Sequence, residues 1–355
     1  MHSAVEAKIQ VERLTSEAQP ALEGFLRAHS TATVFHAPWW HEVIHESYGH
    51  TCDYWVAWSE RQLVGAFPAV TVRVPFLGAK MVAMPYQYHS GIPLADTRQV
   101  ERLLVERALA EARAKKVDYF EICHTDAVPL LAELGFASIP SHLSKTMVPL
   151  EGLEFKKLRE GHRREVYTAL ESGVTFNEDT TLDGLRAFRR LYLAEGRELG
   201  GPRAGWIYFN SLFAHAGASY RLLLARRGGT SIGGLLTPDD GRTVFARCGA
   251  YLGKEARGVN LSKGLLWRSM CDAAARGCRD YDLGISWEQD KGLIKFKEGW
   301  GGKTRSVHIY VYPIRSKPPA PGRYFEGFGL AKAIWRHLPM PVVDWLGHQV
   351  TRWVC

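Results

Sequence analysis

A segment pattern that occurs twice is the strongest constraint on how this chain folds. In the first copy a strand, a loop, a helix and a second strand occupy residues 65–72, 84–97, 99–116 and 117–122. In the second copy the same order occupies residues 244–251, 252–260, 261–276 and 279–285. The helix endings AEARAKKVDYFEI and CDAAARGCRDYDLGI align so that Asp118-Tyr119 falls on Asp280-Tyr281. This internal repeat predicts two copies of one structural unit.

Each copy is expected to form a β-α-β unit, because a strand, a helix and a strand in this order make a right-handed crossover. The length of 355 residues suits two domains better than one. We therefore predict an α/β fold with two domains, each a mixed central sheet flanked by helices. The expected parts are an N-terminal domain at 1–150, a basic C-terminal domain at 151–315, and a Pro-rich linker with an amphipathic tail at 316–355.

Charge is divided unevenly between the two halves. Residues 1–150 carry 13 Lys and Arg against 16 Asp and Glu, whereas residues 151–355 carry 32 against 21, a net charge of +11. A basic half of this kind predicts an anionic partner, such as a nucleic acid, a nucleotide-linked substrate or an acidic lipid surface. The alternative is a basic surface that serves solubility alone.

The sequence predicts a cytoplasmic protein. No apolar run reaches the roughly 18 residues of a transmembrane helix, and the acidic N-terminal segment does not resemble a signal peptide. The six cysteines are scattered without a C-x-x-C pair, which favours reduced thiols. In the tail, Trp335, Trp345 and Trp353 stand among Arg and His, a composition typical of a membrane interface. A helix docked on the core explains the tail equally well.

One motif points to a metal site. His41-Glu42-Val43-Ile44-His45 satisfies H-E-x-x-H, which on a helix places two histidines and a base around zinc, with His50 as a possible third ligand. Against this, no downstream ligand motif follows, and the segment also reads as an amphipathic helix with Trp39, Val43 and Ile44 facing inward. We expect no metal here and keep a zinc-dependent hydrolase as the alternative function.

Two basic segments are candidates for donor binding. The segment EARGVNLSKG links a strand to a helix, where backbone N–H groups bind pyrophosphate, although it has few glycines. The basic helix expected within 154–173 is the second, with a solvated linker helix as the alternative. The candidate donor-binding residues are Arg163, Arg164, Arg257, Gly258 and Lys263. Walker, G-x-S-x-G and G-x-G-x-x-G motifs do not occur, so the usual kinase, serine-hydrolase and dinucleotide folds are disfavoured.

The segment GLIKFKEGWGG at 292–302 is expected to be a loop that presents Lys297. A lysine between an aromatic residue and a glycine turn, in an apolar wall, places a cation where it stabilises an oxyanion. Acyl transfer to an amine needs such a cation and one proton acceptor, for which Asp282 is the candidate. The alternative is a surface ion pair of Lys297 with Glu298 or Glu288.

Five motifs together resemble the FemABX superfamily: FHAPWW, MPYQYHSG, REGHRREVYTALESGV, YDLG and FKEGWGG, spread over residues 30–315. The resemblance implies two GNAT-like domains. It also implies a catalytic Phe296-Lys297 pair and substrate-binding residues at Tyr208, Arg203 and Tyr251. Tyr86, His89 and Trp300, which lie in the quoted motifs, are further candidates for substrate binding. A lysine that some members carry near His45 is missing, which bears on recognition of the same precursor.

The resemblance implies a bacterial N-acyltransferase of cell-envelope biogenesis. The donor is aminoacyl-tRNA or acyl-CoA, no cofactor is tightly bound, and the acceptor is an amine of an envelope or polysaccharide precursor. The tail segment WRHLPMPVVDWLG is similar to members associated with exopolysaccharide and exosortase systems. Such a protein is expected in the cytoplasm, peripheral to the inner membrane through its C-terminal tail. A GNAT-like protein that binds the precursor without catalysis is the second alternative.

Overall fold

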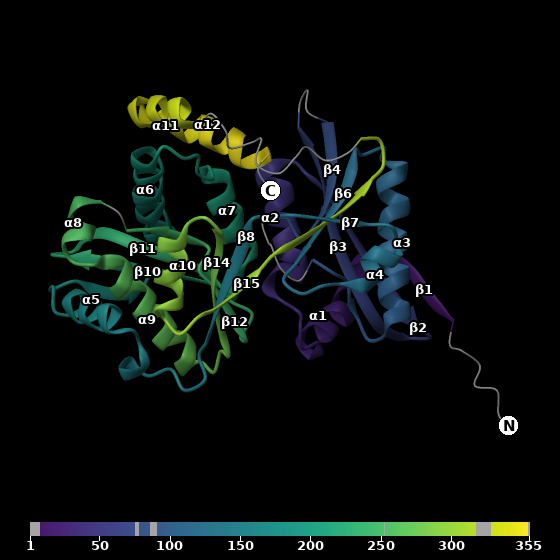
Figure 1. The fold of residues 1–355 in the computed structure, drawn as a ribbon, viewed down its shortest axis with the longest axis horizontal. Helices are drawn as coiled ribbons and strands as arrows, with labels where there is room; N and C mark the ends of the chain where they lie inside the picture. The colour runs from purple at the N-terminus through teal and green to yellow at the C-terminus, as the bar shows by residue number, and fades with distance from the viewer. Residues whose placement is uncertain (1–7, 75–77, 86–90, 252, 317–327, 354–355) are drawn as a thin grey trace. The chain divides into compact units, whose positions relative to one another are not determined.

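The protein is represented by a computed structural model, which describes residues 8–74, 78–85, 91–251, 253–316 and 328–353. It forms two compact units (Figure 1). The division does not follow chain order. The strand at His308–Pro313 pairs with the first unit, whereas the sequence placed these residues in the C-terminal domain. Conversely, Leu143–Pro149 pairs within the second unit. Both differences arise because sheet membership follows backbone pairing between segments distant in sequence.

The first unit is built on one eight-stranded mixed sheet of order β1-β2-β3-β4-β6-β16-β7, with β5 beside β3. Its strands are β1 (Ile9–Arg13), β2 (Thr51–Ser59), β3 (Gln62–Val74), β4 (Gly78–Ala83), β5 (Leu94–Ala95), β6 (Tyr119–His124), β7 (Ala137–Ile139) and β16 (His308–Pro313). Its helices are α1 (Gln19–Ala28), α2 (Pro38–Tyr48), α3 (Arg98–Ala114) and α4 (Pro129–Glu133). Among the described strand pairs of this first sheet, only β4 and β6 pair in parallel.

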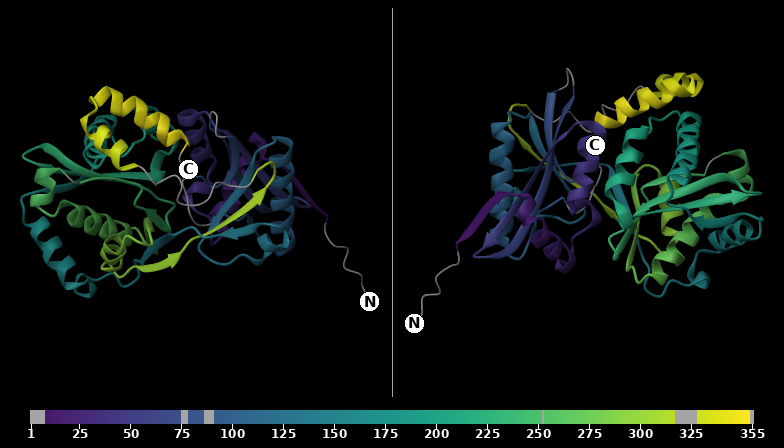
Figure 2. Two further views of the ribbon diagram at one scale, coloured as in Figure 1. Left: turned by 45° about the horizontal axis from the view of Figure 1, so that its top comes forward. Right: turned by 180° about the vertical axis from the view of Figure 1, so that it is seen from behind.

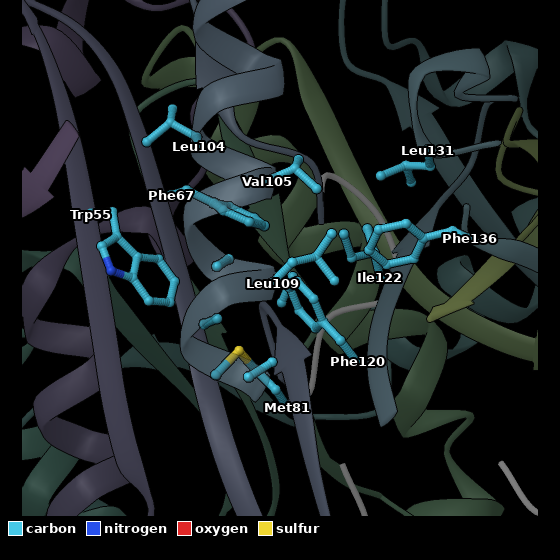
Figure 3. Packing of buried hydrophobic residues seen from close by; sticks show 14 of the residues in the cluster. Trp55, Phe67, Met81, Leu104, Val105, Leu109, Phe120, Ile122, Leu131 and Phe136 are labelled. Carbon is cyan, nitrogen blue, oxygen red and sulfur yellow. The ribbon is translucent and has the colours of Figure 1, made fainter. Parts of the chain in front are cut away.

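Helix α3 covers one face of this sheet and makes its core (Figure 3). Thr97 caps the helix by accepting the N–H of Val100. Leu104, Val105 and Leu109 then recur at helical spacing and pack against Trp55, Phe67 and Phe120 of the sheet. Gly65 allows this close approach, because a Cβ there would lie 2.5 Å from Val100 Cγ1.

The second unit contains two four-stranded sheets, of orders β13-β11-β10-β9 and β12-β14-β8-β15. The strands are β8 (Leu143–Pro149), β9 (Thr175–Glu178), β10 (Tyr220–Arg227), β11 (Thr230–Pro238), β12 (Thr243–Phe245), β13 (Cys248–Ala250), β14 (Asp280–Trp287) and β15 (Lys303–Ser306). The helices are α5 (Glu160–Leu170), α6 (Leu182–Leu199), α7 (Trp206–His215), α8 (Lys254–Gly258), α9 (Leu261–Ala275), α10 (Lys291–Glu298), α11 (Phe328–His337) and α12 (Met340–Trp353). The predicted α/β class with mixed sheets is confirmed.

The internal repeat appears as one parallel strand pair in each unit. Helix α3 precedes β6, which pairs in parallel with β4, and α9 precedes β14, which pairs in parallel with β12. The predicted helices and closing strands are confirmed. The predicted opening strands are wrong in detail, because residues 65–72 lie in the antiparallel β3 and residues 244–251 are divided between two sheets. The division falls where Ala246 N–H bonds to Asp282 and Arg247 N–H bonds to Leu236.

The C-terminal helices α11 and α12 form a hairpin that lies along α6 (Figures 1 and 2). Trp335 and Val343 pack on Leu193 of α6. The tail therefore packs on the second unit, as the expectation of a helix docked on the core had it. Most of the linker before it lies outside the described residues. Among the helices described here, none is long and apolar enough to cross a bilayer.

Candidate active site

Lys297 lies in a helix and not in the loop expected from the sequence. Asp290 caps α10 by accepting the N–H of Leu293 at 3.1 Å, which starts a helix that runs to Glu298. Lys297 stands in its last turn with 6% of its surface exposed. Its Nζ donates hydrogen bonds to the carbonyl oxygens of Gly284 at 2.9 Å and Ile285 at 2.7 Å. The alternative of a surface ion pair is therefore not observed.

A β-bulge in β14 supplies these two carbonyls. Asp282 pairs with Met147 and Ile285 with Lys145, so two residues of β14 oppose one residue of β8. Gly284 adopts φ +72°, which glycine accepts without strain. The ladder is interrupted at this point, and the Gly284 and Ile285 carbonyl oxygens accept hydrogen bonds from Lys297. The glycine of the YDLG motif and the residue after it therefore supply the backbone oxygens that bind Lys297 Nζ.

Burial changes the proton affinity of Lys297. Desolvation lowers its pKa from 10.5 to about 8, Asp282 and Asp290 oppose this shift, and the Lys145 ammonium adds to it. The side chain therefore remains largely protonated at neutral pH. Within the described part of the chain its ammonium has two acceptors, so one of its three N–H donors is left for another ligand.

Lys145 is a site residue that the sequence analysis missed. Its Nζ lies 2.5 Å from Asp282 Oδ2, and both side chains are 3% exposed. Burial lowers the pKa of Lys145, and the Asp282 carboxylate opposes that shift. The available signal was a lysine inside SKTMVPL, a segment predicted to be a strand, since charged residues are seldom buried without a partner.

Asp282 is engaged on both oxygens. Oδ2 is paired with Lys145, and Oδ1 accepts the N–H of Gly284 at 2.7 Å. The carboxylate therefore holds the bulge that seats Lys297. Its expected role as proton acceptor stays a prediction.

An aromatic cluster fixes the last turn of α10. His162 of α5 donates from Nε2 to the carbonyl oxygen of Phe296 at 2.8 Å, and its ring meets Trp300 edge-on at 4.8 Å. Burial lowers the pKa of His162, and the nearby Lys263 ammonium adds to this effect. Gly299 leaves room for the imidazole, because a Cβ there would lie 2.4 Å from His162 Cε1.

Lys263 and Trp300 belong to the same cluster. Lys263 Nζ lies 4.2 Å from the centroid of the Phe296 ring and 3.0 Å from Glu165 Oε2. Burial lowers the pKa of Lys263, and the Glu165 carboxylate opposes the shift. Trp300 is buried in the core of the unit. The structure thus places these two candidate binding residues around Phe296, where they support α10.

The remaining donor-binding candidates are dispersed. Arg163 donates to the carbonyl oxygens of Lys156 and Leu158, and Arg164 is exposed on α5. Arg257 pairs with Glu198 at 2.7 Å, and Gly258 ends α8. The expected loop around these residues contains a short helix, followed by Asn260 in a left-handed conformation at φ +52°. Their role in donor binding stays a prediction.

A second polar cluster brings together two substrate-binding candidates, Arg203 after the end of α6 and Tyr251 directly after β13. The Arg203 guanidinium lies 4.8 Å from the Tyr192 ring centroid and 3.5 Å from Glu195 Oε2. Glu195 Oε1 accepts the backbone N–H of Tyr251 at 2.9 Å. Glu195, a buried residue that the sequence analysis missed, therefore connects Arg203 with Tyr251. Glu195 and Tyr251 also line a pocket of about 470 Å³, together with Arg336 of α11.

Tyr208 of α7 is almost fully buried next to this cluster. Burial raises the pKa of its hydroxyl to about 12, and the nearby Arg247 opposes the shift. Burial likewise raises the pKa of Tyr251 to about 12. Both hydroxyls are therefore neutral hydrogen-bonding groups at physiological pH. Tyr86 and His89 fall outside the described residues.

The H-E-x-x-H segment lies on α2, but its two histidines occupy different environments. His41 is buried against the Tyr54 ring, and burial lowers its pKa to about 4. His45 and Glu42 are exposed, and His45 Nδ1 bonds to the His50 carbonyl oxygen at 2.8 Å. Val43 and Ile44 face inward as predicted, whereas Trp39 is half-exposed. In the described ranges, no group of three or more His, Cys, Asp or Glu is arranged to hold a metal.

Residues 156–293 match the family model described as an acetyltransferase (GNAT) domain. The crystal structure of FemX superposes on this chain with a TM-score of 0.70 and 15% identity, covering 86% of this chain and 98% of that one. The chain therefore shares the fold of FemX. This FemX-like fold is the one that the resemblance in the sequence motifs implies, and the predicted tandem GNAT-like architecture is confirmed. The GNAT match includes His162, Lys263 and Asp282 and ends four residues before Lys297.

Two further structures share the FemX-like fold. A tandem GNAT protein from the clavulanic acid biosynthesis pathway superposes with a TM-score of 0.52 and 14% identity, covering 88% of this chain and all of that one. The C-terminal domain of a putative lysylphosphatidylglycerol synthetase from Agrobacterium fabrum superposes with a TM-score of 0.57 and 14% identity, covering 83% and 91%. No curated protein matches the chain. The FemX-like fold and the GNAT match support an acyltransferase in general terms.

Proposed function

We propose that this protein is a bacterial N-acyltransferase that acts on an amine of a cell-envelope or polysaccharide precursor. The observation that carries the proposal is the buried ammonium of Lys297, which is held by two backbone carbonyls and retains one N–H donor. In a site with little water, such a fixed cation stabilises developing negative charge strongly. The GNAT match over the surrounding residues supports the same class of reaction.

In the proposed reaction the acceptor nitrogen attacks the donor carbonyl carbon. A C–N bond forms, and negative charge develops on the carbonyl oxygen, to which Lys297 donates its remaining N–H. Collapse of the intermediate breaks the C–O bond to tRNA or the C–S bond to CoA, and the amine proton ends on the leaving oxygen or sulfur. Asp282 is the proposed proton acceptor. Each of its oxygens has one partner, Lys145 at Oδ2 and the Gly284 N–H at Oδ1, and a carboxylate has further lone pairs that can accept a proton.

We assign substrate binding to the cluster of Arg203, Tyr208 and Tyr251. Arg203 and Tyr251 are joined through Glu195 beside the pocket of about 470 Å³, so a polar acceptor bound there meets charged and neutral hydrogen-bonding groups. The net charge of +11 in residues 151–355 suits an anionic donor, either aminoacyl-tRNA or acyl-CoA. The proposed place of action is the cytoplasm at the inner membrane, without a tightly bound cofactor.

Donor use is the decisive test. Purified protein is incubated with a cell-envelope precursor extract and either labelled aminoacyl-tRNA or labelled acetyl-CoA, at fixed salt because anion binding depends steeply on it. Transfer of label from either donor, lost in Lys297→Ala, is the expected result. Transfer from neither donor, with precursor binding retained in Lys297→Ala, would favour a GNAT-like binding protein without catalysis. Hydrolysis of the precursor or donor that stops when a chelator removes zinc would instead favour the zinc-dependent hydrolase.

A further inference from the structure

An open pocket of about 340 Å³ lies in the second unit, where the start of α5 meets the end of α10. Its lining consists of three cations, one carboxylate and two glycines: Lys157, Arg159, Lys295, Glu298, Gly299 and Gly301. We call this cavity the α5–α10 pocket. It shares no lining residue with the pocket beside Glu195 and Tyr251, and none of the five donor-binding candidates from the sequence lines it. Three cations around one cavity point to an anionic ligand.

Hydrogen bonds join the two walls of the α5–α10 pocket. The Arg159 backbone N–H donates to the Gly299 carbonyl oxygen at 3.2 Å, which ties α5 to the turn after α10. Arg163 Nη1 donates to the carbonyl oxygens on both sides of Lys157, at 3.0 and 2.7 Å. Leu158, between the two lining cations, is buried in the core. Because the backbone of both walls is fixed, little order has to be imposed when a ligand binds.

Two of the three lining cations have no carboxylate partner. Lys157 is paired with Glu154 at 2.8 Å. Arg159 and Lys295 are exposed, and within the described ranges neither forms an ion pair. Glu298 is the one carboxylate in the lining, and the same holds for it. Arg159 and Lys295 are therefore available to an external anion, which Glu298 would oppose.

The surroundings add to the positive charge of the pocket. Residues 154–165 hold five Lys and Arg against three Glu, and residues 291–298 hold three Lys against one Glu. The Arg159 guanidinium also acts on the neighbouring lysine of α9: burial lowers the pKa of Lys263, the Glu165 carboxylate opposes this shift, and Arg159 adds to it. Cations that repel one another in this way are stabilised by a bound anion.

We propose that the α5–α10 pocket binds phosphate groups, held by Arg159 and Lys295 with Lys157 beside them. Arginine binds phosphate through its planar fork and lysine through a point charge. The two glycines leave the pocket without a side chain that would occupy it. On the proposed N-acyltransferase function, on which this step rests, the phosphates belong to the donor, because Lys295 and Lys297 lie on the same short helix. A phosphate of tRNA and a phosphate of CoA share the required chemistry.

Phosphate binding is tested by titrating full-length protein with CoA and, separately, with uncharged tRNA, each at several salt concentrations. The double variant Arg159→Gln/Lys295→Gln should lose about tenfold or more in affinity for CoA, for tRNA or for both. For tRNA, the slope of log affinity against log salt concentration should become shallower by about one for each cation removed. Glu298→Gln removes the opposing carboxylate and should bind more tightly than wild type. The matched control, Arg190→Gln/Arg279→Gln, removes two exposed cations outside the pocket and should bind as wild type does.

The two probes distinguish the source of the phosphate. Loss of affinity for CoA would assign the pocket to a thioester donor, and loss for tRNA alone would assign it to the backbone of a nucleic acid. Wild type that binds neither probe, or a double variant that binds both as tightly as the control, would overturn the proposal. Circular dichroism establishes that each variant is folded.

Transfer measurements separate this proposal from the proposed function. Wild type that transfers no acyl group, but whose phosphate binding is weakened by Arg159→Gln/Lys295→Gln, would retain the phosphate site and remove the proposed catalysis. Transfer with an unchanged donor KM in the double variant would do the reverse.

Discussion

The Lys145 ammonium and the Asp282 carboxylate form a buried ion pair at 2.5 Å, directly beneath the bulge that seats Lys297. Two cations and one carboxylate therefore share a space with little water. Removing one partner of such a pair leaves an uncompensated charge, which costs more than the pair itself contributes.

Lys145→Met should lower the free energy of unfolding by about 3–5 kcal/mol, because Asp282 would remain buried without its cation. Denaturant unfolding followed by circular dichroism measures this change. The double variant Lys145→Met/Asp282→Leu removes both charges and should be less destabilised than the sum of the two single variants. Additive losses would show that the pair is not coupled.

Lys297→Ala should reduce turnover by about 10² or more, because the oxyanion would lose a preorganised donor. Steady-state transfer with the productive donor is the measurement. Lys291→Ala is the matched control, since Lys291 lies on the same helix but is exposed. Equal activity of the two variants, both folded, would remove Lys297 from the mechanism.

The rate should fall as pH rises through about 8, the lowered pKa of Lys297. The charged fraction decreases from about nine-tenths one pH unit below this value to about one-tenth one unit above it. Lys145→Met should move this alkaline limb to higher pH, because the neighbouring ammonium lowers the pKa of Lys297. A profile that is flat to pH 10 would contradict a role for the ammonium.

The lowered pKa of Lys297 affects stability in the direction opposite to its effect on rate: the free energy of unfolding should rise as pH rises. The folded pKa of Lys297 lies below its unfolded value, so the unfolded chain binds more protons between about pH 8 and 10.5. Below this window burial of the charge opposes folding, and the penalty is relieved as pH rises. Lys297→Met should therefore show a weaker rise of stability across this window than wild type, as measured by denaturant unfolding.

Gly299→Ala should impair both stability and transfer, because its Cβ would collide with the His162 ring that holds Phe296. The expected cost is about 1–3 kcal/mol of unfolding free energy. The control is Gly161→Ala on α5, where a Cβ meets open space and should be neutral or slightly stabilising. Adding His162→Ala to Gly299→Ala should recover part of the stability, and no recovery would place the clash elsewhere.

Local sequence determined a large part of this protein. The periodic apolar residues of Arg98–Ala114 and Leu261–Ala275 predict both crossover helices, because a helix is specified by its own segment and its caps. The matching segments around Asp118 and Asp280, where each helix gives way to its closing strand, predict the repeat. The Phe-Lys motif identified Lys297 as the residue to examine, although its helix was missed because it is only eight residues long and runs directly into the glycine turn at 299–302.

Tertiary structure decided the rest, because the sequence of a strand does not specify which other strand it pairs with. Residues 244–251 form two strands because the second unit has two sheets, and His308–Pro313 pairs with β6 of the first unit. The same holds for the site. Lys145 and Asp282 are far apart in the sequence, and only the pairing of β8 with β14 brings them together under Lys297. Burial there lowers the pKa of the lysine, a property that no local pattern encodes.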